Sequence, residues 1–154
     1  MRETSPQVKE KLAAALITHN PRLERFSFDY SKIAESLRIT EPEARARYTH
    51  IELNPAEGDL AVQLTVYGDH VDIAIPYWYI GADADRVFSQ ISEYLRIIRR
   101  TAGFFVYDPQ TGIAFDPEQS VFQDHLEYDK VVKDLPNIAA LAGKTRTKPW
   151  WKFW

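Results

Sequence analysis

The chain has 154 residues and a formal net charge of −3, and 45% of its residues are hydrophobic. These values are typical of a globular domain with one hydrophobic core, and the absence of cysteine excludes disulfide scaffolds, thiolate metal sites and cysteine nucleophiles. The sequence has no apolar run near the ~18 residues that a membrane span needs and no apolar signal core at its N-terminus. We therefore expect a cytoplasmic protein.

The first third of the chain predicts helices joined by one extended segment. A Ser-Pro start and the apolar spacing predict a helix over residues 5–18, and apolar spacing alone predicts a short helix over residues 31–38. Thr-Glu-Pro-Glu at 40–43 predicts another helical turn or two, through residue 46. Between the first two helices, Phe26, Phe28 and Tyr30 alternate with polar residues. This alternation indicates a short strand or an extended arm.

The middle of the chain predicts an antiparallel meander. Apolar and polar residues alternate over residues 48–53, 62–67 and 71–77. A loop rich in proline and glycine separates the first two segments, and Gly68-Asp69-His70 forms a tight connection between the second and the third. Such a meander has one buried face and one face that is partly open to solvent.

A long helix and a hairpin follow the meander. The helix is expected to start near Asp83. Apolar residues recur with helical spacing from Val87 to Ile98, and Gly103 stands where a glycine would end the helix. Two short strands then flank an Asp-Pro-Gln-Thr-Gly turn at residues 108–112. Asp116 and the proline after it predict the start of a C-terminal helix.

These elements predict a single α+β domain over residues 1–143. We expect an antiparallel sheet of about five strands, made by the three-stranded meander and the hairpin, with the long helix across one face and further helices at both ends. Residues 144–154 form a basic, tryptophan-rich C-terminal tail, with four Lys or Arg residues and no acidic residue.

Three segments of the chain resemble a group of small bacterial proteins. The segments are Ile-Glu-Leu at 51–53, Ile-Pro-Tyr-Trp-Tyr at 75–79 and Gly-Phe-Phe-Val-Tyr-Asp-Pro-Gln at 103–110. In this group a helix leads into a strand that ends in Tyr-Asp-Pro-Gln, and some members look like immunity proteins of contact-dependent or polymorphic toxin systems. The resemblance covers roughly residues 45–117. It implies a protein partner such as a toxin, and it brings no catalytic residues with it.

The clusters of polar residues favour structural roles over catalysis. His70 lies between Asp69 and Asp72, but on a strand only His70 and Asp72 share a face, so a polar hairpin end is favoured over a metal site. Asp83 and Asp85 stand at a helix start, where carboxylates satisfy free backbone N–H groups. The chain has no glycine-rich phosphate loop. We therefore expect no catalytic residue, no metal and no cofactor.

Aromatic and basic residues that folding does not explain predict a protein partner instead. Alternation cannot bury all of the bulky residues 77–80, and the tail has three tryptophans in five residues. Tryptophan, tyrosine and arginine are common interface anchors. The predicted partner-binding residues are Trp78, Tyr79, Gln110, Arg96, Arg100, Trp150, Trp151 and Trp154. Docking of the tail on protein, in the same chain or in a second subunit, is favoured over stable membrane anchoring.

The leading hypothesis is a non-enzymatic protein-binding module, immunity-like, that neutralises a toxin by surface complementarity. One alternative is a small ligand-binding protein or enzyme with a site near His70, Asp72 and Trp78. Another alternative is a structural homodimer held together by the aromatic tail. Nucleic acid is not an expected partner, because the acidic body of the chain does not spread Lys and Arg over one face.

Overall fold

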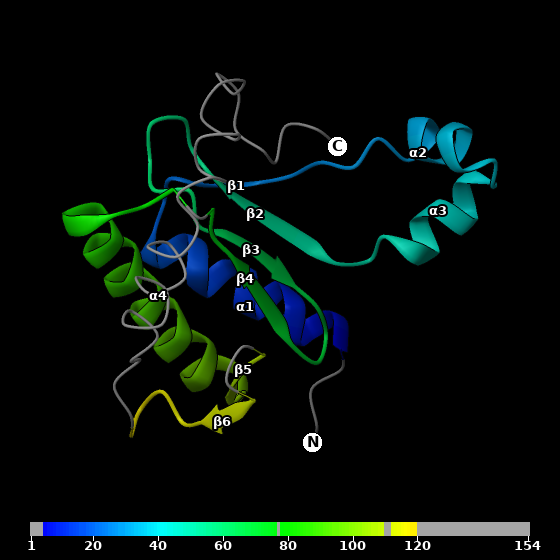
Figure 1. Ribbon diagram of the computed structural model, residues 1–154. Coiled ribbons are helices and arrows are strands. Elements are labelled where there is room, and N and C mark those ends of the chain that lie inside the picture. Colours follow the sequence, from blue (N-terminus) through cyan, green and yellow to red (C-terminus); the bar gives the residue numbers. More distant parts are fainter. Residues whose placement is uncertain (1–4, 77, 110–111, 120–154) are drawn as a thin grey trace. The chain divides into compact units, whose positions relative to one another are not determined.

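The computed structural model describes residues 5–76, 78–109 and 112–119 (Figure 1). Contacts divide the chain into two compact units. Among the described residues, the first unit comprises residues 5–59 and 63–74, and the second comprises residues 60–62 and the described residues from 75 to 119. In the part of the chain that the structure describes, none of the helices has the length and apolar character that a membrane crossing needs.

The first unit contains a four-stranded antiparallel sheet and three helices. The elements in chain order are α1 (Ser5–His19), β1 (Leu23–Arg25), α2 (Tyr30–Leu37), α3 (Glu41–Arg47), β2 (Ile51–Pro55), β3 (Gln63–Val66) and β4 (Val71–Ala74). The strands lie side by side in the order β1-β2-β3-β4, so β1 and β4 are the two edges of this sheet. The predicted meander is therefore confirmed as β2, β3 and β4.

Alternation along the strands gives this sheet an apolar face and a polar face. On the apolar face, Leu53 lies opposite Leu64, and Leu64 lies opposite Ile73. Helix α1 contacts β1, β2 and β3, and its Leu12 and Leu16 are fully buried. On the polar face, Glu52, Thr65 and Asp72 stand in one cross-strand row.

Helices α2 and α3 form a helical arm, which we define as residues 30–47. The carboxylate of Asp29 accepts a hydrogen bond of 3.2 Å from the backbone N–H of Lys32 and so caps α2. At α3, the Thr40 side chain accepts from the Glu43 backbone N–H, and the Glu43 carboxylate accepts from the Thr40 backbone N–H at 2.7 Å. Figure 1 shows the two helices packed together beyond the ends of β1 and β2.

The second unit contains the long helix α4 (Gly81–Ala102) and a hairpin of β5 (Val106–Asp108) and β6 (Ile113–Phe115). Helix α4 buries an apolar stripe that includes Val87, Ile91 and Tyr94. The helix ends at Gly103, whose φ of 76° is left-handed and whose N–H bonds to the carbonyl of Arg99, as the sequence predicts.

Two ionic contacts fasten the hairpin of the second unit to the end of α4. The guanidinium of Arg99 donates two hydrogen bonds, of 3.1 and 3.0 Å, to the carboxylate of Asp116. Arg100 donates one bond of 2.7 Å to Glu118. The same Arg99 lies 4.5 Å from the ring centroid of Phe105. Arginine at the end of α4 thus holds the residues on both sides of the hairpin.

A short piece of chain between β2 and β3 also belongs to the second unit. Residues 60–62 cluster with residues 75 onward, although they interrupt the first unit in the sequence. Ala61 and Val62 are buried, and the Ala61 N–H donates a hydrogen bond of 2.6 Å to the Tyr79 hydroxyl.

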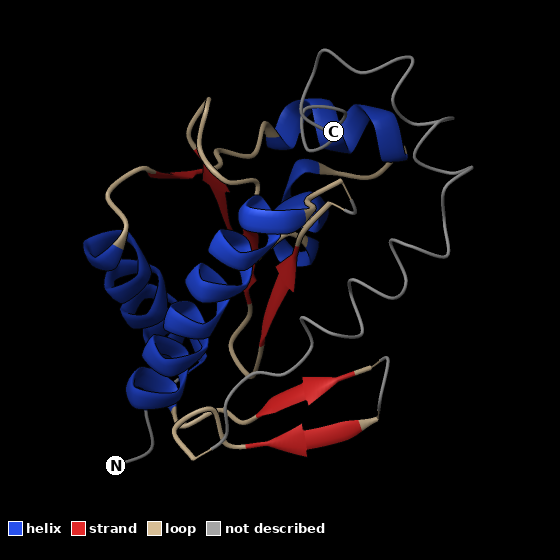
Figure 2. Ribbon diagram, turned by 60° about the vertical axis from the view of Figure 1, so that its left-hand side comes forward, coloured by secondary structure: helices blue, strands red, loops and turns tan. Residues whose placement is uncertain are grey.

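The structure confirms the α+β class and corrects three details of the predicted fold. The prediction of one sheet of about five strands is wrong, because the hairpin forms a separate two-stranded sheet (Figure 2). The first strand is at Leu23–Arg25, before the aromatic alternation. Phe26 and Phe28 lie in the connection that follows this strand, and Tyr30 already begins α2. Helix α4 begins at Gly81 after Ile80, which makes no side-chain cap, and Asp83 instead pairs with Arg86.

The predicted C-terminal helix and the tail lie outside the described residues. The residues predicted to start the C-terminal helix are described: the Asp116 carboxylate accepts a hydrogen bond of 3.0 Å from the Glu118 backbone N–H. Residues 117–119 form a turn.

Candidate functional site

The first unit contains a pocket of about 360 Å³. Its walls come from the first turns of α1, the chain that leaves β1, the helical arm and the chain that enters β2. Two kinds of side chain dominate these walls. The aromatic and imidazole rings belong to Phe26, Phe28, Tyr30, Tyr48 and His50, and the charged groups belong to Lys9, Glu10, Arg25 and Arg45.

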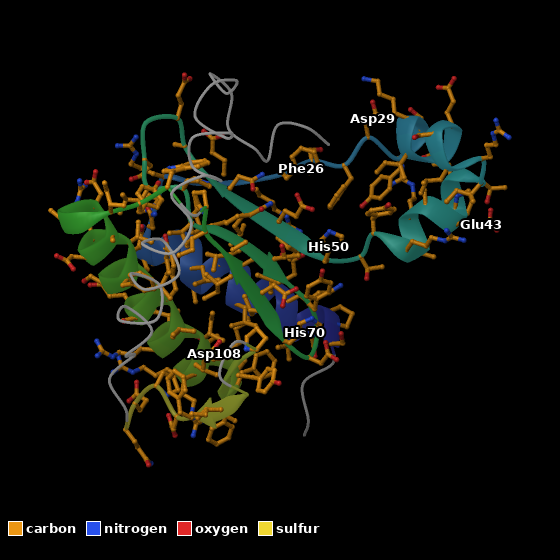
Figure 3. All side chains as sticks on the ribbon, in the orientation of Figure 1. Phe26, Asp29, Glu43, His50, His70 and Asp108 are labelled. Atoms are coloured by element: carbon orange, nitrogen blue, oxygen red, sulfur yellow. The ribbon has the colours of Figure 1, made fainter. Side chains whose placement is uncertain are left out.

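The rings form one continuous cluster with Phe28 at its centre. The Phe28 ring centroid lies 5.1 Å from that of Phe26, 5.7 Å from that of Tyr48 and 5.0 Å from that of His50. Tyr30 lies 6.0 Å from Phe28, and its hydroxyl donates to the backbone carbonyl of Tyr48. These contacts join the segment after β1 to the segment before β2. Phe26 is 38% exposed, and Figure 3 shows it on the segment that leads from β1 toward the helical arm.

Arg25 is held in place by a carboxylate on α1. Its guanidinium donates two parallel hydrogen bonds of 2.9 Å to the two oxygens of Glu10. This bond lowers the pKa of Glu10, which the nearby charges of Arg25 and Lys9 lower further. Both partners therefore stay charged at neutral pH. A bidentate pair of this kind fixes the direction of the guanidinium plane.

Arg45 and Lys9 bring two more cations to the pocket. Arg45 bonds to Glu41, one turn earlier on α3, at 2.6 and 3.1 Å, and its guanidinium lies 4.4 Å from the ring centroid of Tyr30. The Lys9 ammonium donates to the backbone carbonyl of Thr49. Lys9, Arg25 and Arg45 thus come from three separate elements and are each positioned by a contact of their own.

The ring cluster continues beyond the pocket along the polar face of the sheet. His50 lies 5.4 Å from Tyr67, and Tyr67 stacks on His70 with ring centroids 4.2 Å apart. Each histidine contacts a carboxylate, His50 to Glu52 at 3.1 Å and His70 to Asp69 at 2.7 Å. Burial, followed by the negative charges of Asp72 and Glu52, raises the pKa of the Tyr67 hydroxyl.

The contact between His70 and Asp69 agrees with the polar hairpin end that the sequence favours. It also lowers the pKa of Asp69. The described residues contain no group of three or more His, Asp or Glu side chains that could hold a metal ion. His70 and Asp72 belong to the first unit and Trp78 to the second, and the pocket is lined by none of the three.

The predicted partner-binding residues that the structure describes all belong to the second unit. Trp78 is 52% exposed, whereas Tyr79 is half-buried and its hydroxyl accepts from the Ala61 N–H. Arg96 is exposed on α4, and Arg100 pairs with Glu118. The structure therefore gives Tyr79 and Arg100 contacts within their own unit. The other predicted residues, Gln110, Trp150, Trp151 and Trp154, lie outside the described residues.

Sequence reasoning missed the pocket in the first unit, although one signal for it was present. The alternation of Phe26, Phe28 and Tyr30 identified the extended segment that supplies much of the aromatic wall. The cations Lys9 and Arg45 left no such signal, because they come from helices on either side of that segment.

Comparison with known proteins identifies no family for this chain. No family model matches the chain. No curated protein and no solved structure matches it either.

Proposed function

We propose that this chain is a non-enzymatic protein-binding module and that the pocket and the helical arm of the first unit are its recognition surface. One observation carries the proposal: three cationic side chains from three elements are fixed around one aromatic-walled pocket. Arginine and tyrosine are enriched among the residues that dominate binding energy at protein interfaces. Side chains that are already held in place lose less conformational entropy when a partner binds.

The electrostatics of the pocket support binding over proton transfer. A general acid or base works best when its pKa lies near the working pH. In this pocket the pKa of Glu10 is lowered and that of Arg25 is raised, which moves both values away from neutrality. The pair therefore acts as a fixed arrangement of charges.

Residues 45–117 resemble a group of small bacterial proteins, some of which look like immunity proteins, and this resemblance suggests a partner class for the proposal. An immunity protein binds its toxin and thereby neutralises it, so the partner would be a toxin produced by the same or a neighbouring cell. The surface complementarity that this requires is provided by side chains of different kinds. The pocket offers rings such as Phe26 and Tyr30 beside cations such as Arg45.

A photo-crosslinking residue placed at position 26 tests the proposal. The control is the same residue at Ala14, which is exposed on α1 and does not line the pocket. In cells that express the protein naturally, position 26 should give a covalent adduct with one protein of defined mass, and position 14 should not. Equal labelling at both positions, or no adduct at position 26, would rule out the pocket as the recognition surface.

A further inference from the structure

The partner chemistry can be narrowed from the charges and rings of the same pocket. We infer that the pocket binds an acidic peptide segment in which a carboxylate side chain stands next to an apolar or aromatic one. This inference rests on the proposed function, because it names what the recognition surface recognises. It is argued from the positions of Lys9, Arg25 and Arg45 and from the exposed part of Phe26.

The local charge of the pocket is opposite to that of the chain. The whole chain has a net charge of −3. The residues that line the pocket include three cations, Lys9, Arg25 and Arg45, and one acid, Glu10. Glu41 also pairs with Arg45, so the pocket keeps a positive charge even when both acids are counted. The positive charge of the pocket therefore attracts an approaching carboxylate, whereas the net negative charge of the chain repels it.

Lys9 is the cation best suited to receive an incoming carboxylate. Arg25 and Arg45 each bond to a carboxylate of their own chain, whereas the contact of the Lys9 ammonium is with the uncharged backbone carbonyl of Thr49. An ammonium has three N–H donors. Lys9 can therefore keep its bond to Thr49 and still donate to a partner.

The aromatic wall provides the apolar half of the recognition. Phe26 leaves 38% of its surface exposed beside the pocket, and the ring of Phe28 contacts it edge to face with the centroids 5.1 Å apart. A rigid aromatic ring offers contact area at a low cost in conformational entropy. An apolar side chain next to the carboxylate of the partner would cover this ring.

The observations favour a peptide over single-stranded nucleic acid, which also binds to rings beside cations. Nucleic acid binding needs a positive groove that follows several phosphates. Here the row of rings that leaves the pocket passes beside Glu52 and Asp69, which contact His50 and His70. These carboxylates would repel a phosphate backbone beyond the pocket.

A peptide titration tests the inference. A Glu-Phe-Glu peptide with blocked ends is added to the isotope-labelled full chain, and binding is monitored by the amide chemical shifts of the protein. We expect saturable shifts centred on Ser27 and Thr49, which line the pocket. The Gln-Phe-Gln peptide should bind more weakly by up to about fivefold, the upper end of the range expected when an exposed ion pair is lost. Lys9→Gln should weaken binding of the acidic peptide to the same extent.

Lys11→Gln is the matched control, since Lys11 is an exposed cation on the same helix that does not line the pocket. This variant should bind the acidic peptide as the unmodified chain does. Equal binding of the two peptides, equal losses in the two variants, or tighter binding of an oligothymidylate would overturn the inference. An adduct at position 26 without binding of the acidic peptide would remove this inference alone, whereas absence of the adduct would remove the proposed function.

Discussion

Replacement of Gly68 by alanine should loosen the start of α1 from the β3–β4 hairpin. A Cβ at Gly68 would overlap the Oγ of Ser5 and would lie 2.6 Å from the Cβ and 3.2 Å from the Cα of that residue. The first carbon–carbon distance is about 1 Å shorter than an ordinary contact of 3.5–4.0 Å. Rotation of the Ser5 side chain moves its Oγ but not its Cβ. Overpacking of this kind destabilises a protein by typically 1–3 kcal/mol.

The substitutions at Ser5 make the prediction quantitative. Ser5→Ala removes the Oγ but keeps the Cβ at 2.6 Å, so it should relieve little of the destabilisation caused by Gly68→Ala. Ser5→Gly leaves only the Cα at 3.2 Å, which a small shift accommodates. In a double-mutant cycle, Gly68→Ala should therefore couple to Ser5→Gly by about 1–2 kcal/mol, within the range for residues in contact.

Thermal and urea unfolding followed by far-ultraviolet circular dichroism measures these differences. A loss of 1 kcal/mol lowers the Tm of a chain of this size by roughly 2–4 °C. Unchanged stability of the Gly68→Ala variant would refute the steric argument. Equal recovery by Ser5→Ala and Ser5→Gly would show that the Oγ of Ser5, and not its Cβ, decides the packing.

Three further substitutions test the contacts that shape the two units. Thr40→Ala removes the side-chain cap of α3 and should lower stability by about 1 kcal/mol, measured by urea unfolding against Thr40→Ser, which retains the cap. The hydrogen bond to Arg99 is the main cause that lowers the pKa of Asp116 from 3.8, so the contribution of Asp116 to stability is complete above pH 3.8 and is lost as the pH falls through the lowered value. In a pH series of thermal unfolding, Asp116→Asn should therefore lose less stability at acidic pH than the unmodified chain. An unaltered pH profile would contradict the pairing. Tyr79→Phe removes the acceptor of the Ala61 N–H and should destabilise the second unit by about 1–3 kcal/mol, and unchanged hydrogen exchange at that amide would argue against the bond.

The long helix shows how far local sequence signals reach. The spacing of Val87, Ile91 and Ile98 and the glycine at position 103 identified α4 and its end, because helical periodicity and a left-handed C-terminal residue are local properties. The start was less well predicted. The helix starts at Gly81 after Ile80, which makes no side-chain cap, whereas the sequence predicted a start at the acidic residue Asp83.

The pairing of the hairpin could not be read from the sequence. Alternation predicts that a segment is a strand and which residues share a face, but it does not identify the neighbouring strand. Both the meander and the hairpin have such patterns, and the structure places them in different sheets. The pocket escaped prediction for a related reason. Its cations belong to α1, β1 and α3, and only the folded chain brings Lys9, Arg25 and Arg45 to one cavity.

The short segment at residues 60–62 has a consequence for how the protein can fold and be divided. The chain passes from the first unit to the second at residue 60, returns at residue 63 and leaves again after residue 74. Neither unit is a continuous stretch of sequence. A fragment ending at residue 74 would separate the buried residues Ala61 and Val62 from the unit with which they cluster, and a fragment starting at residue 75 would lack the N–H donor to Tyr79. The two units are therefore expected to be inherited, expressed and folded as one piece.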